Sequence, residues 1–548
     1  MLAVSAPPED SPAARTLRAA GREMAREATG LAYRRAAAGA AILGLMAYGF
    51  AMANFTLAGD EWFSLYPEFT LDTDYTLWAG RWLMPVIWSI TGNGAFVPYV
   101  TLAVALALLT LAGLLAASAW RFTGGWPVFA VTALFVTCPL LTDSLSFEQG
   151  HISSPLAMVV AATAGWLVLR HGGKRLLRIV TVAGLVAWTL ASYQPTALVF
   201  AVVVMGGEVR RAAVEGPGYW RAAFPRWLDG AAAVLAGVAV YAVSVPVAWW
   251  VTGTDPGAGR GAYSLVGGYP ALGDLAGLVR SGGRAVGRFW FGDTALYPFA
   301  LKAFGIALIV GGAAAAATRA AGRREVGCTR WGRAGTAAWV ALLAAASLVV
   351  PFSVLFLRSD PPADGSNFTT VGLVVGFWAG LALEEARRRK PARGSRGAGV
   401  AVGVVVLVLA LGGAFQVNRG FVGLYLGNQR DLFNANRMLA VMEQMPEFSS
   451  GEEVRMELVG RVGFHLTGPP LANPVPGTPG TTIVNCSGLA CQNRLVHMLN
   501  LIGGGERGFV VKSVSRRPAV REEVAGMPSW PEPGSIRYLE GTFVIKGG

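Results

Sequence analysis

Long apolar runs separated by short polar stretches dominate this chain. A helix needs about 20 apolar residues to cross a hydrocarbon core of about 30 Å, because each residue rises about 1.5 Å. The pattern therefore predicts a polytopic α-helical membrane protein with about eleven spans inside residues 37–417. The spans are expected near residues 37–57, 95–117, 126–142, 152–170, 176–192, 195–207, 230–251, 297–317, 335–357, 366–385 and 398–417. The sixth is short, and one interpretation is a tight hairpin with the fifth that reaches only partway across.

Composition supports a membrane protein. Of the 548 residues, 53% are hydrophobic and only 14% are charged, whereas soluble domains usually carry about 25% charged residues. The mean hydropathy of +0.47 excludes an ordinary soluble globule, a disordered chain and a disulfide-rich mini-protein. The N-terminus shows no early apolar core, so the first span is expected to direct insertion without a cleaved signal peptide.

The basic residues predict which side each loop faces. The net charge is +13, and the lysines and arginines lie in short loops between apolar runs, which favours a bilayer over nucleic acid. With the N-terminus inside, the cytoplasmic segments hold 26 Lys and Arg and the opposite loops hold six. The positive-inside rule favours that orientation. It makes residues 1–36 a cytoplasmic basic arm, 208–229 a cytoplasmic loop, and everything after 418 extracytoplasmic.

Residues 418–548 differ in character from the apolar part. Residues 428–445 have apolar positions at helical spacing and predict an amphipathic helix. Short β-rich runs follow at 454–464, 481–487, 507–514 and 536–545, so a small extracytoplasmic α/β domain is expected. Cys486 and Cys491 lie close enough in sequence to pair if this domain is in an oxidising compartment.

The first outer loop, about 57–94, contains the leading candidates for chemistry. Asp60 and Glu61 follow the first span, and a carboxylate at the rim of a wet pocket suits a general base. The plain alternative is a pair of solvated loop acids. Arg81 is the one base in this acidic loop, and its guanidinium could pair with an acid or hold a phosphate. The neighbouring tryptophans could equally form an interfacial aromatic belt.

Three further groups of polar residues lie at the same predicted membrane face. Asp143, Glu148 and His151 crowd one short loop and could form a second acid site or an acceptor site, but their spacing matches no metal-ligand pattern, so no metal is predicted. Tyr193 and Gln194 occupy the turn before the sixth span, where a polar amide is costly unless it has buried partners. Arg280, Arg284 and Arg288 would share one helical face suited to an anionic headgroup or a lipid-linked phosphate; simple solvation is the alternative.

The order of these motifs resembles the bacterial glucosyltransferase family that modifies O-antigen, a branch of the membrane glycosyltransferases with the GT-C fold. The resemblance rests on Asp60-Glu61, Gly80-Arg81-Trp82, Ser146-Phe147-Glu148-Gln149 and Ser192-Tyr193-Gln194. It covers roughly residues 40–210, with a similar span plan up to about 440. The family more often shows two aspartates where this chain has Asp60-Glu61, and Asp72 and Asp74 form a competing pair.

The resemblance implies an inverting hexosyltransferase that uses a polyprenyl-phosphate sugar, with glucose expected, on the extracytoplasmic face of the bacterial inner membrane. The acceptor would be a cell-surface or lipid-linked glycan. Asp60 would be the base, Glu61 or Glu148 its helper, Arg81 the phosphate clamp with Arg284 or Arg288, and Gln194 a sugar contact. No Walker A, GxSxG, HExxH or dinucleotide motif is present, which agrees with chemistry that needs no cofactor.

Two other classes of function compete with an enzyme. A flippase or transporter of lipid-linked glycan would use intramembrane charges and two related halves, but few charges lie inside the apolar runs and no matched halves are evident. A non-enzymatic envelope assembly protein would work through the C-terminal domain.

Overall fold

The computed structural model divides the chain into two compact units. The first comprises residues 1–52, 72–145 and 149–418, and the second comprises 53–71, 146–148 and 419–548. The structure describes residues 30–54, 56, 76–77, 79–91, 98–146, 148–170, 174–216, 219–254, 275–292, 297–322, 330–357, 369–388, 395–448, 453–460, 489–503, 508–511 and 518–547.

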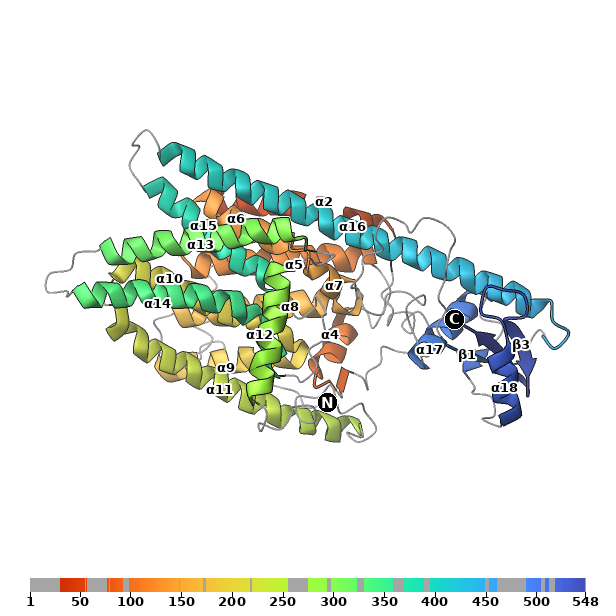
Figure 1. The fold of residues 1–548 in the computed structure, drawn as a ribbon. Helices are drawn as coiled ribbons and strands as arrows, with labels where there is room; N and C mark the ends of the chain where they lie inside the picture. The colour runs from red at the N-terminus through yellow and green to blue at the C-terminus, as the bar shows by residue number, and fades with distance from the viewer. Residues whose placement is uncertain are drawn as a thin grey trace. The chain divides into compact units, whose positions relative to one another are not determined.

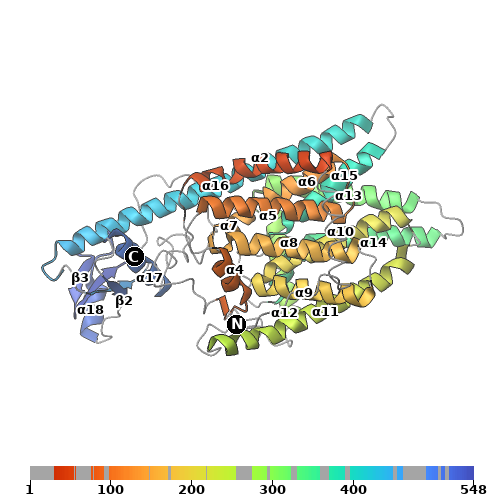
Figure 2. The same cartoon turned by 180° about the vertical axis from the view of Figure 1, so that it is seen from behind.

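The first unit is a bundle of helices packed side by side (Figure 1 and Figure 2). The long helices are α2 (Leu31–Ala53), α5 (Pro98–Ala119), α8 (Glu148–Arg170), α9 (Arg175–Ser192), α10 (Ala197–Glu215), α11 (Tyr219–Thr252), α13 (Phe299–Gly322), α14 (Arg330–Val349), α15 (Val371–Arg388) and the first part of α16 (Ser395–Glu443). The shorter elements are α4 (Leu83–Thr91), α6 (Gly125–Val136), α7 (Leu141–Leu145), α12 (Leu275–Phe291) and the 3-10 helices η2 (Gln194–Thr196) and η5 (Val350–Leu357).

Eight helices among the described residues are long and apolar enough to cross a membrane: α2, α5, α8, α9, α11, α13, α14 and α16. Each of the eleven expected ranges overlaps a helix of the bundle. The other three helices that overlap expected spans, α6, α10 and α15, are too short or too charged to count as spans. Helix α6 has 12 residues, and α10 and α15 each carry four charged residues in their second halves. A mostly helical membrane protein is therefore confirmed, while eleven crossings stay a prediction.

The expected loop at 208–229 is wrong for most of its length. Helix α10 continues to Glu215, and α11 already begins at Tyr219. With 19 residues, α10 is about 28 Å long at 1.5 Å per residue. The partial crossing suggested for the fifth and sixth spans stays a prediction. Charged residues were taken to end the sixth span, but Glu208 is buried and accepts hydrogen bonds from the Tyr219 hydroxyl at 2.5 Å and the Trp227 indole at 3.2 Å.

Glycines bring α6 and α15 into close contact at the centre of the bundle. Gly372, Gly376 and Gly380 recur every four residues along one face of α15. A β-carbon at Gly376 would lie 2.9 Å from the α-carbon of Val131 in α6. The same spacing of small residues lets helix backbones approach each other in membranes. This packing explains how the 12-residue α6, nearly all of it buried, is held among longer helices.

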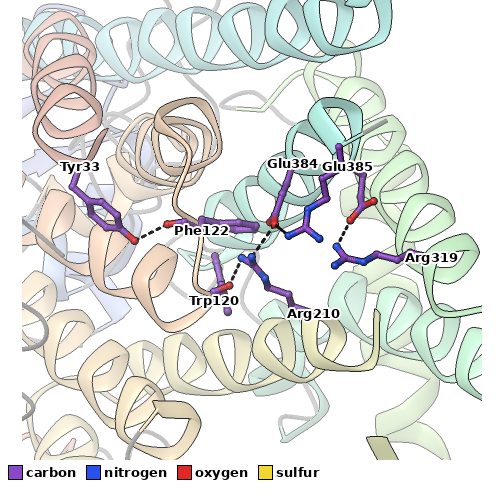
Figure 3. Close-up of polar contacts among 8 residues, drawn as sticks. Tyr33, Trp120, Phe122, Arg210, Arg319, Glu384 and Glu385 are labelled. Atoms are coloured by element: carbon purple, nitrogen blue, oxygen red, sulfur yellow. Dashed lines mark hydrogen bonds and ion pairs between the residues drawn. The ribbon is translucent and has the colours of Figure 1, made fainter. Parts of the chain in front are cut away.

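An ion-pair network joins helices at the end of the bundle where α10, α13 and α15 finish, called here the basic end (Figure 3). Arg210 of α10 donates to Glu384 of α15 at 2.9 Å and to the carbonyl of Trp120. Arg388 also pairs with Glu384, and Arg319 of α13 pairs with Glu385. Since Arg210 and Glu384 are mostly buried, each neutralises a charge that would otherwise be costly inside the bundle.

The second unit contains a four-stranded sheet in the order β2-β1-β4-β3. The strands are β1 (Val454–Val459), β2 (Phe509–Val511), β3 (Ile536–Leu539) and β4 (Thr542–Lys546), with helices α17 (Leu489–Ile502) and α18 (Pro518–Gly526). Strand β1 runs parallel to β2 and β4, whereas β3 and β4 form an antiparallel hairpin. Three of the four expected β-rich runs thus contain strands. The fourth, 481–487, lies outside the described residues, as does Cys486; nothing is described of the Cys491 side chain.

The amphipathic helix expected at 428–445 is not separate from the last span. Both belong to α16, which continues without a break from Ser395 to Glu443. The pattern of apolar positions changes near residue 418, where the first unit ends, but no proline interrupts the helix there. An amphipathic stretch can therefore follow a span within one helix.

Candidate functional site

A tight turn positions Arg81 at the start of α4. The Gly80 amide donates to the Leu77 carbonyl at 3.0 Å, and the Arg81 amide donates to the Thr76 carbonyl at 2.7 Å. Gly80 has a φ of +71°, in the left-handed region that favours glycine. The Gly-Arg step of the sequence is therefore a conformational requirement, since the turn aims the Arg81 side chain back toward α9.

Arg81 meets Gln194, although 113 residues separate them in the sequence. Its Nε donates to Gln194 Oε1 at 3.1 Å. Its guanidinium carbon lies 4.6 Å from the centre of the Tyr193 ring, which is a cation–π contact. Two motifs that were expected to share one site, Gly80-Arg81 and Tyr193-Gln194, are thus in direct contact.

The Gln194 amide is fixed from three directions. Its Nε2 donates to the Ala79 carbonyl at 2.6 Å and to the Tyr241 hydroxyl at 3.0 Å, so both amide hydrogens are used. Because the Arg81 Nε is only a donor and a carbonyl is only an acceptor, these contacts determine which way the amide faces. Gln194 holds Arg81 in place; its predicted contact with a sugar stays a prediction.

Tyr241 of α11 completes this group and was not among the expected residues. It is buried at 3% exposure and packs with Ala187, Ala191 and Val245. A β-carbon on Gly80 would collide with its hydroxyl oxygen. A signal was present in the sequence: Tyr241 and Ser244 put two polar groups three residues apart, on one face of an apolar helix.

The tryptophans around this turn act as hydrogen-bond donors. Trp82 donates its indole N–H to the Ser244 hydroxyl at 2.9 Å, and Trp249 donates to the Leu77 carbonyl at 2.8 Å. Both bonds join the turn before α4 to α11. An interfacial belt alone would not need these partners, so the tryptophans also position the Arg81 turn.

Arg81 has binding capacity left over. Its side chain is half-buried, and in the part of the chain that the structure describes only its Nε has a hydrogen-bond acceptor. The two terminal nitrogens therefore remain available to an anion, in the forked geometry that suits a phosphate. The cluster of Arg81, Tyr193, Gln194 and Tyr241 is called here the Arg81 site.

His151 lies near the end of α7 and has both ring nitrogens engaged. Nδ1 is 3.0 Å from the Thr101 hydroxyl, and Nε2 is 2.8 Å from the Leu145 carbonyl. Because that carbonyl can only accept, Nε2 carries a proton and donates it. These contacts tie α8 to α5 and to the end of α7. A role for His151 in substrate binding would require one of them to open, and it stays a prediction.

The structure does not test the predicted carboxylates. Asp60, Glu61, Asp72 and Asp74 lie outside the described residues, and for Asp143 and Glu148 only the helical backbone is described. Across the described positions, no group of three or more His, Cys, Asp or Glu could hold a metal ion.

Arg284 and Arg288 lie on a different element from the Arg81 site. They extend from α12, which is helical as the four-residue spacing suggested, and both are exposed together with Arg280. The main packing partners of α12 are η5 and α13. The expected shared face is confirmed, but a role in substrate binding is not tested by this arrangement.

One comparison with known proteins matches the region that contains the Arg81 site. Residues 49–259 match the family model described as Glucosyl transferase GtrII. This range includes Arg81, Tyr193, Gln194 and Tyr241 and ends before α12. No curated relative and no solved structure matches the chain. The match confirms the resemblance to a glucosyltransferase family drawn from the sequence: over residues 49–259 this membrane protein is similar to the GtrII glucosyl transferase family.

Proposed function

We propose that this protein is a membrane glucosyltransferase of the GT-C type, which moves glucose from a polyprenyl-phosphate donor to a glycan acceptor at the cell surface. The observation that carries the proposal is the Arg81 site inside the family match, where Gln194 holds the guanidinium at Nε and the two terminal nitrogens have no acceptor among the described residues. A lipid-linked donor keeps its phosphate at the membrane interface, so a clamp at a turn between spans suits it.

The proposed reaction is a single inverting displacement. Asp60, with Glu61 or Glu148 as helper, takes the proton from an acceptor hydroxyl, whose oxygen attacks the anomeric carbon of the sugar. A carbon–oxygen bond forms on one face while the bond to the phosphate oxygen breaks on the other. The polyprenyl phosphate leaves with the bonding electrons, and Arg81 stabilises the negative charge that develops on it. No metal or cofactor takes part.

In this scheme the N-terminus is cytoplasmic, the Arg81 site opens to the extracytoplasmic face of the bacterial inner membrane, and the chain after residue 418 is extracytoplasmic. The support is the distribution of basic residues along the chain. The acceptor is a glycan or lipid-linked glycan.

A direct assay tests the proposal. Purified full-length protein is mixed with polyprenyl-phosphate glucose and a glycan acceptor, and transfer of labelled glucose is measured. Replacing one group that stabilises transition-state charge typically lowers a rate by about 10²–10³-fold, so Arg81→Gln is expected to fall in that range. Asp60→Asn should lose about 10²–10⁴-fold, as expected for a general base.

Controls separate a site effect from unfolding. Arg81→Lys keeps the positive charge but loses the forked N–H donors of the guanidinium, so it should retain intermediate activity. Arg455→Gln removes an exposed arginine from the second unit and should leave transfer unchanged. If Asp60→Asn and Glu61→Gln both transfer glucose at the unaltered rate, the base is assigned to the wrong residue. If no polyprenyl-phosphate hexose supports transfer, the reaction itself is wrong.

A further inference from the structure

Helix α12 runs across the bundle rather than along it. In Figure 1 its axis crosses the direction of α13 and α14. It packs against η5, which follows the end of α14, and against α13, whose first residue is Phe299. The other ends of α13 and α14 lie at the basic end of the bundle. Helix α12 therefore lies at the opposite end of the bundle, where the Arg81 site also lies. A helix that crosses spans at their ends lies in the plane of the membrane surface.

One side of α12 is anchored firmly to the bundle. The Trp290 indole donates to the Leu348 carbonyl at 2.9 Å, and Phe289 stacks against Phe352 with ring centres 4.8 Å apart. The fully buried Lys302 donates to the Gly292 carbonyl at 2.8 Å, just beyond the C-terminus of α12. A cation at that position also interacts favourably with the helix dipole. The helix is therefore fixed in its rotation.

The other side of α12 is a basic stripe. Its exposed residues recur at helical spacing: Ala276, Val279, Arg280, Gly283, Arg284, Arg288 and Phe291. The helix itself has no acidic residue, and among the described residues none of its three arginines takes part in an ion pair. Val279 is 55% exposed and Phe291 is 73% exposed, so large apolar side chains accompany the arginines.

This combination has a specific chemical match. Arginines with no acidic partner among the described residues are complementary to phosphate, and apolar side chains on the same face suit the acyl region just below the headgroups. A soluble anionic partner would match the charges but leave Val279 and Phe291 in water. We infer that α12 is an interfacial helix whose Arg280, Arg284 and Arg288 bind the headgroups of anionic phospholipids on the membrane face where the Arg81 site lies.

The test measures lipid binding and does not depend on sugar transfer. Full-length protein in neutral detergent micelles is titrated with dansyl-labelled phosphatidylglycerol, and Kd is read from energy transfer out of the tryptophans. One basic residue near an anionic surface contributes about 1 kcal/mol, or roughly fivefold in affinity. The variant R280Q/R284Q/R288Q is therefore expected to weaken binding by at least about tenfold, allowing for partial compensation by other cations.

Matched variants make the result specific. The triple lysine variant R280K/R284K/R288K keeps the charge and should restore most of the affinity, which also shows that the glutamine variant acts through charge. The variant R455Q/R521Q/R537Q removes three exposed arginines from the second unit and should change Kd less than about twofold. Dansyl-labelled phosphatidylcholine should bind weakly to all of them.

Three results would overturn the inference. The first is an unchanged affinity for phosphatidylglycerol in the glutamine variant. The second is equal binding of phosphatidylcholine and phosphatidylglycerol. The third is displacement of the labelled lipid by millimolar inorganic phosphate alone, because that would identify an anion site without a lipid surface. Glucosyl transfer could fail in every variant without bearing on any of these outcomes.

Discussion

Gly80 is the residue on which the Arg81 site depends most directly. Its φ of +71° costs an alanine about 1–2 kcal/mol, and the Tyr241 hydroxyl occupies the space where a β-carbon would lie. The Gly80→Ala substitution therefore carries two separate energetic costs, backbone strain and a collision with Tyr241. The chain also offers a position where only the first applies, since Gly253 has a φ of +70° and nothing within 4 Å of a β-carbon.

We expect Gly80→Ala to lower the thermal stability of the detergent-solubilised protein more than Gly253→Ala does. The difference between the two isolates the collision with Tyr241. Adding Tyr241→Phe removes the oxygen that collides, so the double variant G80A/Y241F should regain part of the loss. Equal unfolding midpoints for the two alanine variants would show that Tyr241 does not restrict position 80.

At this scale the sequence predicted three of the four residues of the Arg81 site. Arg81, Tyr193 and Gln194 were expected because a lone base in an acidic loop and an amide between apolar runs are both chemically unusual. Tyr241 was missed because a tyrosine inside a long apolar run is ordinary, and only the fold reveals that it faces Gly80. The carboxylates remain predictions from sequence alone.

Single helices show how charge can be misjudged from sequence. The apolar runs placed every long helix of the bundle, because burial in lipid and burial in protein favour the same residues, whereas α4 lies inside the expected first outer loop. The last residues of α10 and the first residues of α11 were not predicted to be helical, because Glu208, Arg210 and Arg211 suggest a loop in water. In the fold Arg210 pairs with Glu384 of α15, Glu208 accepts from the Tyr219 hydroxyl of α11, and Arg211 donates to the Leu169 carbonyl of α8, so the helix continues. Hydropathy cannot reveal partners that lie far away in the sequence.

Glu384 is the element-scale position we expect to be most sensitive. It holds Arg210 of α10 and Arg388 of its own helix, and its side chain is 16% exposed. Removing one partner of a buried pair costs about 3–5 kcal/mol; since some solvent reaches this pair, we expect about 1–3 kcal/mol for Glu384→Gln. The measurement is thermal unfolding of the solubilised protein, followed by tryptophan fluorescence.

The matched control is Glu453→Gln in the second unit. Glu453 pairs with Arg455 at 3.1 Å, but both side chains are about half exposed, at 56% and 44%. Such surface pairs contribute about 0–1 kcal/mol, so this variant should unfold almost like the parent. If Glu384→Gln were equally mild, the network at the basic end would not hold the helices together.

For the molecule as a whole, the two units differ in what stabilises them. The bundle depends on membrane-facing helices, whereas the second unit has its own sheet and core. In that core α17 packs on β1 and β2, and Asn500 of α17 accepts from the Phe509 amide at 2.7 Å and donates to its carbonyl at 3.1 Å. The sequence predicted the strands from the alternation of apolar and polar positions. Helix α17 was not predicted, because the residues before it are rich in proline and glycine.

The second unit should lose stability in mild acid. Burial lowers the pKa of His497 in α17 below its ordinary value of 6.5. The unfolded state therefore binds more protons than the folded state once the pH drops below about 6.5, and stability decreases there by at most about 1.4 kcal/mol per pH unit. Limited proteolysis of the full-length protein between pH 7.5 and 5.5 should show faster cleavage of this unit in acid.

His497→Gln keeps a polar side chain of similar reach but does not titrate. It should make the cleavage rate of the second unit depend less on pH between 7.5 and 5.5, whatever its effect on stability at pH 7.5. A variant that shows the parent's full acid sensitivity would place the responsible group elsewhere.

The pairing of Arg210 with Glu384 also has a consequence for how the protein is made. The carboxylate follows the guanidinium by 174 positions in the chain. A ribosome adds about 5–20 residues each second, so Arg210 waits roughly 9–35 s for its counter-charge. Until then, the contacts described for Arg210 that can form include those with the Trp120 carbonyl and the Phe122 ring, both synthesised earlier. We expect these two groups to hold the Arg210 side chain while the second half of the chain is still being translated.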